Sequence, residues 1–540
     1  MVLSKLYGFV LPSNGVVDIL AQIYAASRDT RSCIIALLSV IGTTFAYRII
    51  YSIIFSPLRS IRGPWLARLT SLRADILIAS GFMWRLARKD FEEYGDLFVT
   101  MPDAVTVCDP DDIRMLLGNT AVNKAPFYRI LKFTGIENTL SYQDNASALV
   151  RHRQIGPFLR SAYLSKMEGT IMREGVLSIK SKWDKLLDES PNGVVEVNYC
   201  DDFIIGVFGV ISTLVHGRRL EELNNSESAA TWIKKSLSFL GTRSMVQMLP
   251  SFISKPLLSP WEHYYTRLSM YTHESISKRT RYLKEIENSN KDSERPADLL
   301  QAFIDAEDAE SKCKMSYGEI HSECLLMMQA GTDTTSQTIA TTVHLLLLHP
   351  LYHKRAVEEI RSQFDSDHVI TYNECREKLP FLEACIFESL RLEPVTGGIL
   401  ARVSPKGGVT IKGHFIPEGT SIMVNLAAAN RHGRHWERPY EFDPTRFLGN
   451  REARSKIMTF SSGRRTCPGR QLAWWEMLTI LANILKDYDL KMPSDCANFG
   501  PGMLDKNGYP KTMDWRMFIT IKPKDSDRDC RVLVSRAKTA

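Results

Sequence analysis

The chain has 540 residues, of which 44% are hydrophobic and 24% are charged, and its formal net charge is +7. These values match an ordinary globular protein. Basic residues are spread along the chain rather than concentrated on one helix face, which argues against a nucleic-acid-binding protein. The ten cysteines include no C-x-x-C pair, which argues against a disulfide framework and against a zinc site.

An apolar segment near the N-terminus carries the membrane signal of the sequence. Cys33–Tyr47 has no charged residue, Arg48 follows, and Ile49–Phe55 is apolar again. The stretch reaches about the 20 residues needed to cross a bilayer, and Arg48 near one end can extend to the headgroups. We expect an N-terminal segment over residues 1–31, one transmembrane helix over 32–55, a hinge over 56–66, and a large domain over 67–540. The loop arginines slightly favour a cytoplasmic position for that domain.

The large domain is predicted to be mostly α-helical with a small β region. Leu97–Thr100 and Ala104–Cys108 are typical of a β-hairpin. A second hairpin is predicted late in the chain, from Gly408–Lys412 through Gly413 to Phe415–Val424 around Pro417-Glu418-Gly419. The residues between these segments are predominantly of helical pattern. Strands at both ends of a helical body indicate one interwoven domain.

The clearest helix is predicted from Ser316 to His349. Ser316 and Glu319 form a capping-box pattern, and Pro350 ends the helix. Its middle, Ala330–Ser336, contains a glycine and several hydroxyl side chains, which are poor interior helix formers. We expect a local bulge or kink there. The alternative is a Thr-rich helix whose hydroxyls bond to their own carbonyl groups.

The strongest chemical signal is the segment Phe460-Ser-Ser-Gly463-Arg-Arg465-Thr-Cys467-Pro-Gly469. Glycines let the backbone pass close to a flat ligand, and an apolar helix begins directly after Cys467. A cysteine near a helix N-terminus is favoured as the anionic thiolate, which is the form that binds metals.

This segment resembles the haem-binding loop of the cytochrome P-450 family, the haem-thiolate monooxygenases. The resemblance implies haem b with Cys467 as the axial iron ligand, a thiolate that favours cleavage of the O–O bond. Ala330-Gly331-Thr332-Asp333-Thr334 is similar to the family's oxygen-activation motif, in which Asp333 and Thr334 would supply protons. The same comparison identifies the cofactor-binding positions as Cys467, Arg465, Arg402, Phe460, Gly463, Gly469, Ala330, Gly331 and His152.

Two further motifs occur in the family's order, and one departs from it. Glu388-x-x-Arg391 resembles the E-x-x-R motif, and Phe442–Phe447 resembles the segment whose arginine, here Arg446, completes a structural triad. Glu358 and Arg361 also fit E-x-x-R, but we interpret that pair as an ordinary surface salt bridge. The departure is Gly156, which stands where the family carries an arginine for a haem propionate. Arg151 or Arg153 substitutes for it, or the contact is absent.

The resemblance implies a membrane-anchored monooxygenase that inserts one oxygen atom of O2 into an apolar substrate. It also implies a separate NADPH-dependent flavoprotein reductase and a cytoplasmic domain at the endoplasmic reticulum membrane. The hinge region leans towards filamentous fungi and secondary metabolism. The alternatives are a haem-thiolate isomerase or dehydratase that needs no O2, and a non-catalytic membrane protein that binds haem or lipid.

The implied substrate pocket is mixed apolar, which suggests a terpenoid or polyketide-like intermediate. It would be lined by five stretches, at Ala125–Glu137, Trp232–Pro250, Leu325–Asp333, Pro394–Leu400 and Gly508–Met513.

Overall fold

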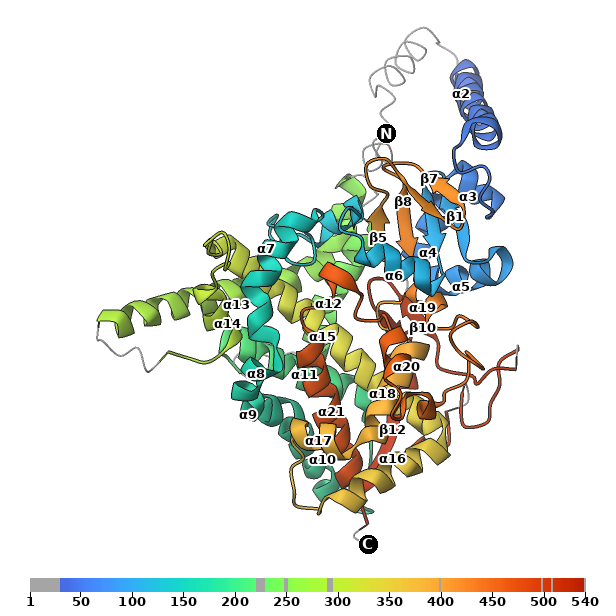
Figure 1. The fold of residues 1–540 in the computed structure, drawn as a ribbon. Coiled ribbons are helices and arrows are strands. Elements are labelled where there is room, and N and C mark those ends of the chain that lie inside the picture. The colour runs from blue at the N-terminus through green and yellow to red at the C-terminus, as the bar shows by residue number, and fades with distance from the viewer. Residues whose placement is uncertain are drawn as a thin grey trace.

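In the computed structural model, the described residues are 30–219, 229–246, 251–288, 295–397, 400–496, 499–506 and 508–538. The described part begins with a long helix, which consists of the α-helix α2 (Thr30–Ile50) and the π-helical turn η1 (Tyr51–Phe55). This helix projects away from the rest of the molecule (Figure 1). Its apolar side chains are exposed, and Ile34–Phe55 is long and apolar enough to cross a membrane. Residues 32–55 are therefore helical as expected, whereas residues 1–29 lie outside the described part.

The segment expected as a hinge packs tightly against the domain. Leu58 and Ile61 are buried, and the N–H group of Val99 donates to the carbonyl of Arg62 at 2.8 Å. Arg48, at the end of the apolar helix, donates to the carbonyl of Leu69 at 2.9 Å. The apolar helix therefore joins the domain through a docked segment and not through a free linker.

The body of the molecule is predominantly helical, as predicted (Figure 1). Its first half contains α3 (Trp65–Leu69), α4 (Leu72–Ser80), α5 (Met83–Tyr94), α6 (Pro110–Gly118), α7 (Asn145–Ile155), α8 (Ser161–Leu164), α9 (Glu168–Ile171), α10 (Ser178–Glu189), α11 (Tyr199–His216), α12 (Ala229–Val246) and α13 (Ser251–Asn288). Its second half contains α14 (Leu299–Asp305), α15 (Tyr317–Leu348), α16 (Pro350–Gln363), α17 (Tyr372–Lys378), α18 (Pro380–Leu392), α19 (Leu426–Ala429), α20 (Arg451–Lys456), α21 (Arg470–Asp487) and α22 (Ser526–Asp529).

One mixed sheet joins the two ends of the domain, which confirms the interwoven arrangement. Its strand order is β1-β2-β8-β5-β3, with β1 and β2 forming the predicted hairpin. The strands are β1 (Leu97–Met101), β2 (Ala104–Val107), β3 (Asn123–Lys124), β5 (Leu400–Val403) and β8 (Ser421–Val424). Three smaller sheets are formed by β4 (Val194–Asn198) with β12 (Arg531–Arg536) and β9 (Tyr488–Lys491), by β6 (Val409–Ile411) with β7 (His414–Ile416), and by β10 (Trp515–Met517) with β11 (Ile521–Pro523).

The second hairpin is formed by β6 and β7 across Gly413, and a turn at Pro417 divides the segment Phe415–Val424. A turn closes where the N–H group of Thr420 donates to the carbonyl of Pro417, and it separates β7 from β8. Proline has no N–H group to donate to a sheet, which is why the strand stops at Pro417.

The long helix α15 crosses the centre of the domain beside α11 and α21 (Figure 1). The capping box is present as predicted: Ser316 accepts from the N–H group of Glu319, whose carboxylate accepts from that of Ser316. The expected bulge is absent, because α15 is one uninterrupted α-helix across Gly331. α11 is also apolar enough to span a membrane, but it is buried in the core.

The predicted structural triad is assembled between α18 and the loops that follow it. Arg391 and Glu388 on α18 are both fully buried, with Nε of Arg391 at 2.6 Å from Oε2 of Glu388. Arg446, on the short helix η8 (Pro444–Phe447), lies with its Nε 3.5 Å from Oε1 of the same glutamate. Arg391 also donates to the backbone carbonyls of Asn430, Pro439 and Glu441, so one side chain fixes several loop segments.

The interpretation of Glu358 and Arg361 as a salt bridge with each other is wrong. Glu358 pairs with Lys354, at 3.6 Å. Arg361 pairs with Asp489 at 2.9 Å and donates to the carbonyls of Leu485, Lys486 and Tyr488. The guanidinium therefore caps the C-terminal end of α21, where carbonyl groups lack helical partners and favour a cation.

Candidate active site

A cavity of about 550 Å³ lies between the middle of α15, the segment before α21, and the strand β5. Its volume is within the range of small-molecule sites in proteins. Eight of the nine predicted cofactor positions line this cavity, and so do both predicted catalytic residues. The ninth, Gly463, lies in the turn beside the cavity. The sequence motifs, which are far apart in the chain, therefore converge on one site.

Cys467 lies on the cavity wall at the end of a tightly closed loop. The loop is held by a hydrogen bond from the N–H group of Cys467 to the carbonyl of Phe460, at 2.9 Å. Burial raises the pKa of the Cys467 thiol, whereas the N–H groups of Gly469 and Arg470 at the start of α21 favour the thiolate. Gly463 has φ +69°, and an added Cβ would collide with the carbonyl oxygen of Leu117, so glycine is required there.

Three cationic side chains gather at one end of the cavity. Arg465 donates to Oδ1 of Asn145 and to the carbonyls of Gln143 and Asp144, while its buried Nη1 has no hydrogen-bond partner. Arg402, on β5, is buried and donates to the carbonyl of Ala401 at 3.1 Å. Lys124, on β3, is buried beside it, because the two residues are paired in the β3–β5 register.

His152 on α7 also lines the cavity, as expected. Burial, helped by the positive charges of Arg465 and Lys124, lowers its pKa to about 4, so the imidazole is neutral near pH 7. The two arginines expected to substitute for Gly156 do not line the cavity. Arg151 is buried against Glu319 and Glu323, and Arg153 pairs with Asp308 and Glu310.

Ala330 and Gly331 form part of the cavity wall on α15. An added Cβ at Gly331 would lie 3.1 Å from Cδ1 of Ile211 on α11, which is closer than side chains normally pack. The glycine therefore permits the close approach of α11 to α15 and does not break the helix. Two of the hydroxyls bond back to the helix, as the alternative interpretation held: Thr334 donates to the carbonyl of Ala330 at 2.8 Å, and Ser336 to that of Thr332 at 2.7 Å. The hydroxyl of Thr332 has no hydrogen-bond partner among the described residues.

Asp333 does not point into open space but is held by a hairpin late in the chain. Nζ of Lys522 on β11 lies 3.0 Å from its Oδ1, and the hydroxyl of Thr520 donates to its Oδ2. Lys522 is partly exposed, with 29% of its side-chain surface accessible, whereas Asp333 is buried. The ion pair therefore connects the acid beside Thr334 to the outside of the domain.

Four of the five stretches expected around the substrate contribute residues to the cavity, among them Phe127, Leu237, Leu326 and Val395. Residues 247–250 and 398–399 of these stretches lie outside the described part. The fifth stretch, Gly508–Met513, was assigned wrongly. The wall there is made by residues 517–520 and by Lys522, because the chain turns into the cavity only at the β10–β11 hairpin.

The sequence analysis missed four charged residues in the cavity wall: Lys124, Glu323, Glu476 and Lys522. Glu476 lies on α21, where burial raises the pKa of its carboxyl group well above the usual range against a weaker opposite effect of Thr335. Because Glu476 stands within an otherwise apolar stretch of α21, the sequence alone could have indicated it as a candidate site residue. The two lysines carried no such signal, because ordinary surface lysines have the same local sequence pattern.

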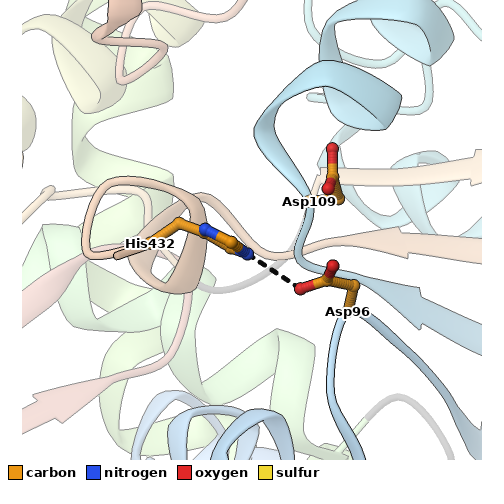
Figure 2. Close-up of side chains that lie close together, drawn as sticks. All are labelled: Asp96, Asp109 and His432. Atoms are coloured by element: carbon orange, nitrogen blue, oxygen red, sulfur yellow. Dashed lines mark hydrogen bonds and ion pairs between the residues drawn. The ribbon is translucent and has the colours of Figure 1, made fainter. Parts of the chain in front are cut away.

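A second cluster of metal-ligand types, Asp96, Asp109 and His432, lies outside the cavity (Figure 2). His432 points to Asp96, with Nε2 2.9 Å from Oδ1. Burial would raise the pKa of Asp109, but hydrogen bonds from Lys412 and from the N–H groups of Asp112 and Asp111 outweigh it and lower the pKa to about 2. Lysine already neutralises these carboxylates, so the cluster is a structural junction between α6 and the late loops.

Comparisons with known proteins agree with this geometry. A family model described as Cytochrome P450 matches residues 69–500. Cytochrome P450 monooxygenase helB1 of Aspergillus fumigatus is 40% identical over 93% of this chain and 86% of its own length. Cytochrome P450 monooxygenase helB2 of the same fungus is 38% identical over 94% of this chain and 99% of its own length. Cytochrome P450 monooxygenase LUC2 of a Fusarium species is 26% identical over 80% of this chain.

Proposed function

Because the chain belongs to the cytochrome P450 family of oxygen-incorporating oxidoreductases, we propose that it inserts one oxygen atom of O2 into an apolar small molecule held in the cavity. The observation that carries the proposal is the position of Cys467 in the wall of a cavity lined mainly by apolar side chains. Asp333 and Thr334, on α15, line the same cavity.

The residues of the cavity fit a haem b group. Haem b is a flat apolar macrocycle with an iron at its centre and two anionic propionates at one edge. The Cys467 thiolate would hold the iron, and the unpartnered Nη1 of Arg465 is an unused donor for a propionate. Arg402 and the neutral imidazole of His152 would add further donors at the same end. When bound, the haem would supply the iron chemistry that activates O2.

The protein's own side chains would deliver protons to the reacting oxygen. Thr334 is at the cavity surface and keeps acceptor capacity on its hydroxyl oxygen while it donates to Ala330. Asp333 would resupply the proton, and Lys522, which reaches the solvent, holds this acid in place. Such a positioned relay is needed wherever bound ligands exclude bulk water from the reacting atoms.

The lining supports an apolar substrate of medium size, such as a terpenoid or polyketide-like intermediate. The charged residues of the wall are few: the cation group, the Asp333–Lys522 pair, and the buried Glu323 and Glu476. Fungal relatives support a role in secondary metabolism. The exposed apolar helix Ile34–Phe55 supports single-pass anchoring, with the domain at the cytoplasmic face of the endoplasmic reticulum. A separate NADPH-dependent flavoprotein reductase would supply the electrons, as redox partners generally do for monooxygenases of this family.

Isotope labelling tests the proposal. The full-length chain in membranes, with a fungal NADPH-dependent reductase and extracts of apolar metabolites, should form products that carry one 18O atom from 18O2. Products formed without O2 and NADPH would favour the isomerase or dehydratase alternative. Haem binding with no turnover of any extract, together with unaltered NADPH consumption, would favour a non-catalytic haem or lipid binder.

A further inference from the structure

Lys124 is a buried lysine in the cavity wall, and the proposed function does not yet assign it a role. Its Nζ donates to the carbonyl of Leu140 at 2.7 Å and lies 4.6 Å from the ring centre of Tyr128. An ammonium group has three donors, so a single backbone carbonyl leaves it incompletely satisfied. Burial of an ammonium group is costly unless an anion or several hydrogen bonds compensate it.

In the described part of the chain, the carboxylates nearest the cation group act on it only from beyond ion-pair distance: Glu323 on Lys124 and Asp144 on Arg465. Among the described residues, no ion pair joins Lys124, Arg402 or Arg465 to an acidic side chain within 4.0 Å. Burial, followed by the charges of Arg465 and Arg402, lowers the pKa of Lys124 well below its usual value. Three mutually repelling cations in one wall are stable together when an anion of more than one charge lies among them.

The same wall lacks a cation where the family pattern places one. Position 156 is a glycine directly after α7, and its N–H group donates to the carbonyl of His152 one turn earlier. Residues four apart lie on the same helix face, so a side chain at 156 would extend towards the cavity that His152 lines. An added Cβ at Gly156 meets no atom within 4 Å, so the space is open.

We propose that Lys124 binds a haem propionate and thereby replaces the arginine that position 156 lacks. The inference rests on the proposed haem site and adds to it the residue that completes its anion-binding end. The β3–β5 pairing fixes Lys124 opposite Arg402, and the carbonyl of Leu140 and the ring of Tyr128 orient the ammonium group. The cation has moved from a helix end to a two-residue strand, while the charge at this end of the cavity is kept.

Haem retention measures this role without any substrate. The variant Lys124→Met keeps the length and apolar stem of the side chain and removes its charge. Transfer of haem to excess apomyoglobin should be faster than from the wild type by about tenfold or more, the range of one charge-assisted hydrogen bond. The matched control is Lys132→Met in the next segment, because Lys132 pairs with Glu137 at 2.8 Å and does not line the cavity. The control should transfer haem at the wild-type rate.

A rescue variant separates propionate binding from a merely structural role. In the Lys124→Met background, Gly156→Arg should restore slow haem transfer, because it returns a cation to the same end of the cavity. Transfer from Lys124→Met at the rate of the Lys132→Met control would overturn the inference. Fast transfer with no rescue, accompanied by a lower melting temperature of the haem-free chain, would also overturn it by showing that Lys124 only supports Leu140. A wild-type chain that binds no haem would instead refute the proposed function.

Discussion

Substitution of Thr334 by alanine is the most informative perturbation of the proton supply. The hydroxyl donates to the carbonyl of Ala330, which is one turn earlier in the same helix. Loss of this bond costs about 1 kcal/mol, and the better helix propensity of alanine returns about half of that. The folded state and haem binding should therefore be almost unchanged.

The effect on the reaction should be much larger than the effect on stability. A positioned proton donor contributes roughly 100-fold to 10,000-fold to a proton transfer, although water that enters the space of the lost hydroxyl recovers part of this. We expect NADPH consumption to continue, hydrogen peroxide release to rise, and product per NADPH to fall several-fold. Parallel assays of NADPH, peroxide and product measure this coupling directly.

Thr342→Ala is the matched control, because Thr342 makes the same kind of bond, to the carbonyl of Thr338 at 2.9 Å, two turns further along α15. It is buried and does not line the cavity. Unchanged coupling in Thr334→Ala, or an equal loss in Thr342→Ala, would refute the assignment of Thr334 as a proton relay.

Three further predictions concern haem retention, stability and pH. Arg465→Ala should purify with markedly less haem than Arg153→Ala, measured as haem per chain, and equal losses would contradict the geometry. Arg391→Met should lower the free energy of unfolding by about 3–5 kcal/mol in denaturant titrations, because it leaves the Glu388 carboxylate buried without its partner; a change below about 1 kcal/mol would be inconsistent with this. Burial lowers the pKa of His344 to about 3. Below about pH 6.5 the unfolded chain therefore binds a proton at this histidine that the folded chain does not bind. Stability is consequently lost as the pH falls from about 6.5 towards 3. The melting temperature of His344→Gln should fall less steeply over this range than that of the wild type, and identical slopes would refute the role of His344.

Local features of the sequence were enough to predict the parts of the site that adjoin each other in the chain. The loop from Phe460 to Gly469 and the capping box at Ser316 depend on residues a few positions apart, so a pattern can represent them. The hydroxyl-rich middle of α15 was predicted as part of the site, but its expected bulge is absent, since Gly331 is used for packing against Ile211.

Features that depend on distant pairing could not be predicted in this way. Lys124 enters the cavity because a two-residue strand pairs with β5, nearly three hundred positions later, and no local pattern encodes that register. The pocket stretch expected at Gly508–Met513 lies several residues before the β10–β11 hairpin that lines the cavity and holds Asp333, because such short strands have little periodicity and were not predicted. Arg361 was misassigned for the same reason, since its carbonyl partners at the end of α21 are remote in sequence.

The spectrum of the reduced carbon monoxide complex tests the central claim, that the Cys467 thiolate holds the haem iron. The wild-type chain should show the long-wavelength Soret band that only a thiolate ligand produces, and Cys467→Ser should lose it. Cys313→Ser, which removes an exposed thiol outside the cavity, should keep the band. A normal spectrum in Cys467→Ser would contradict the assignment of this site.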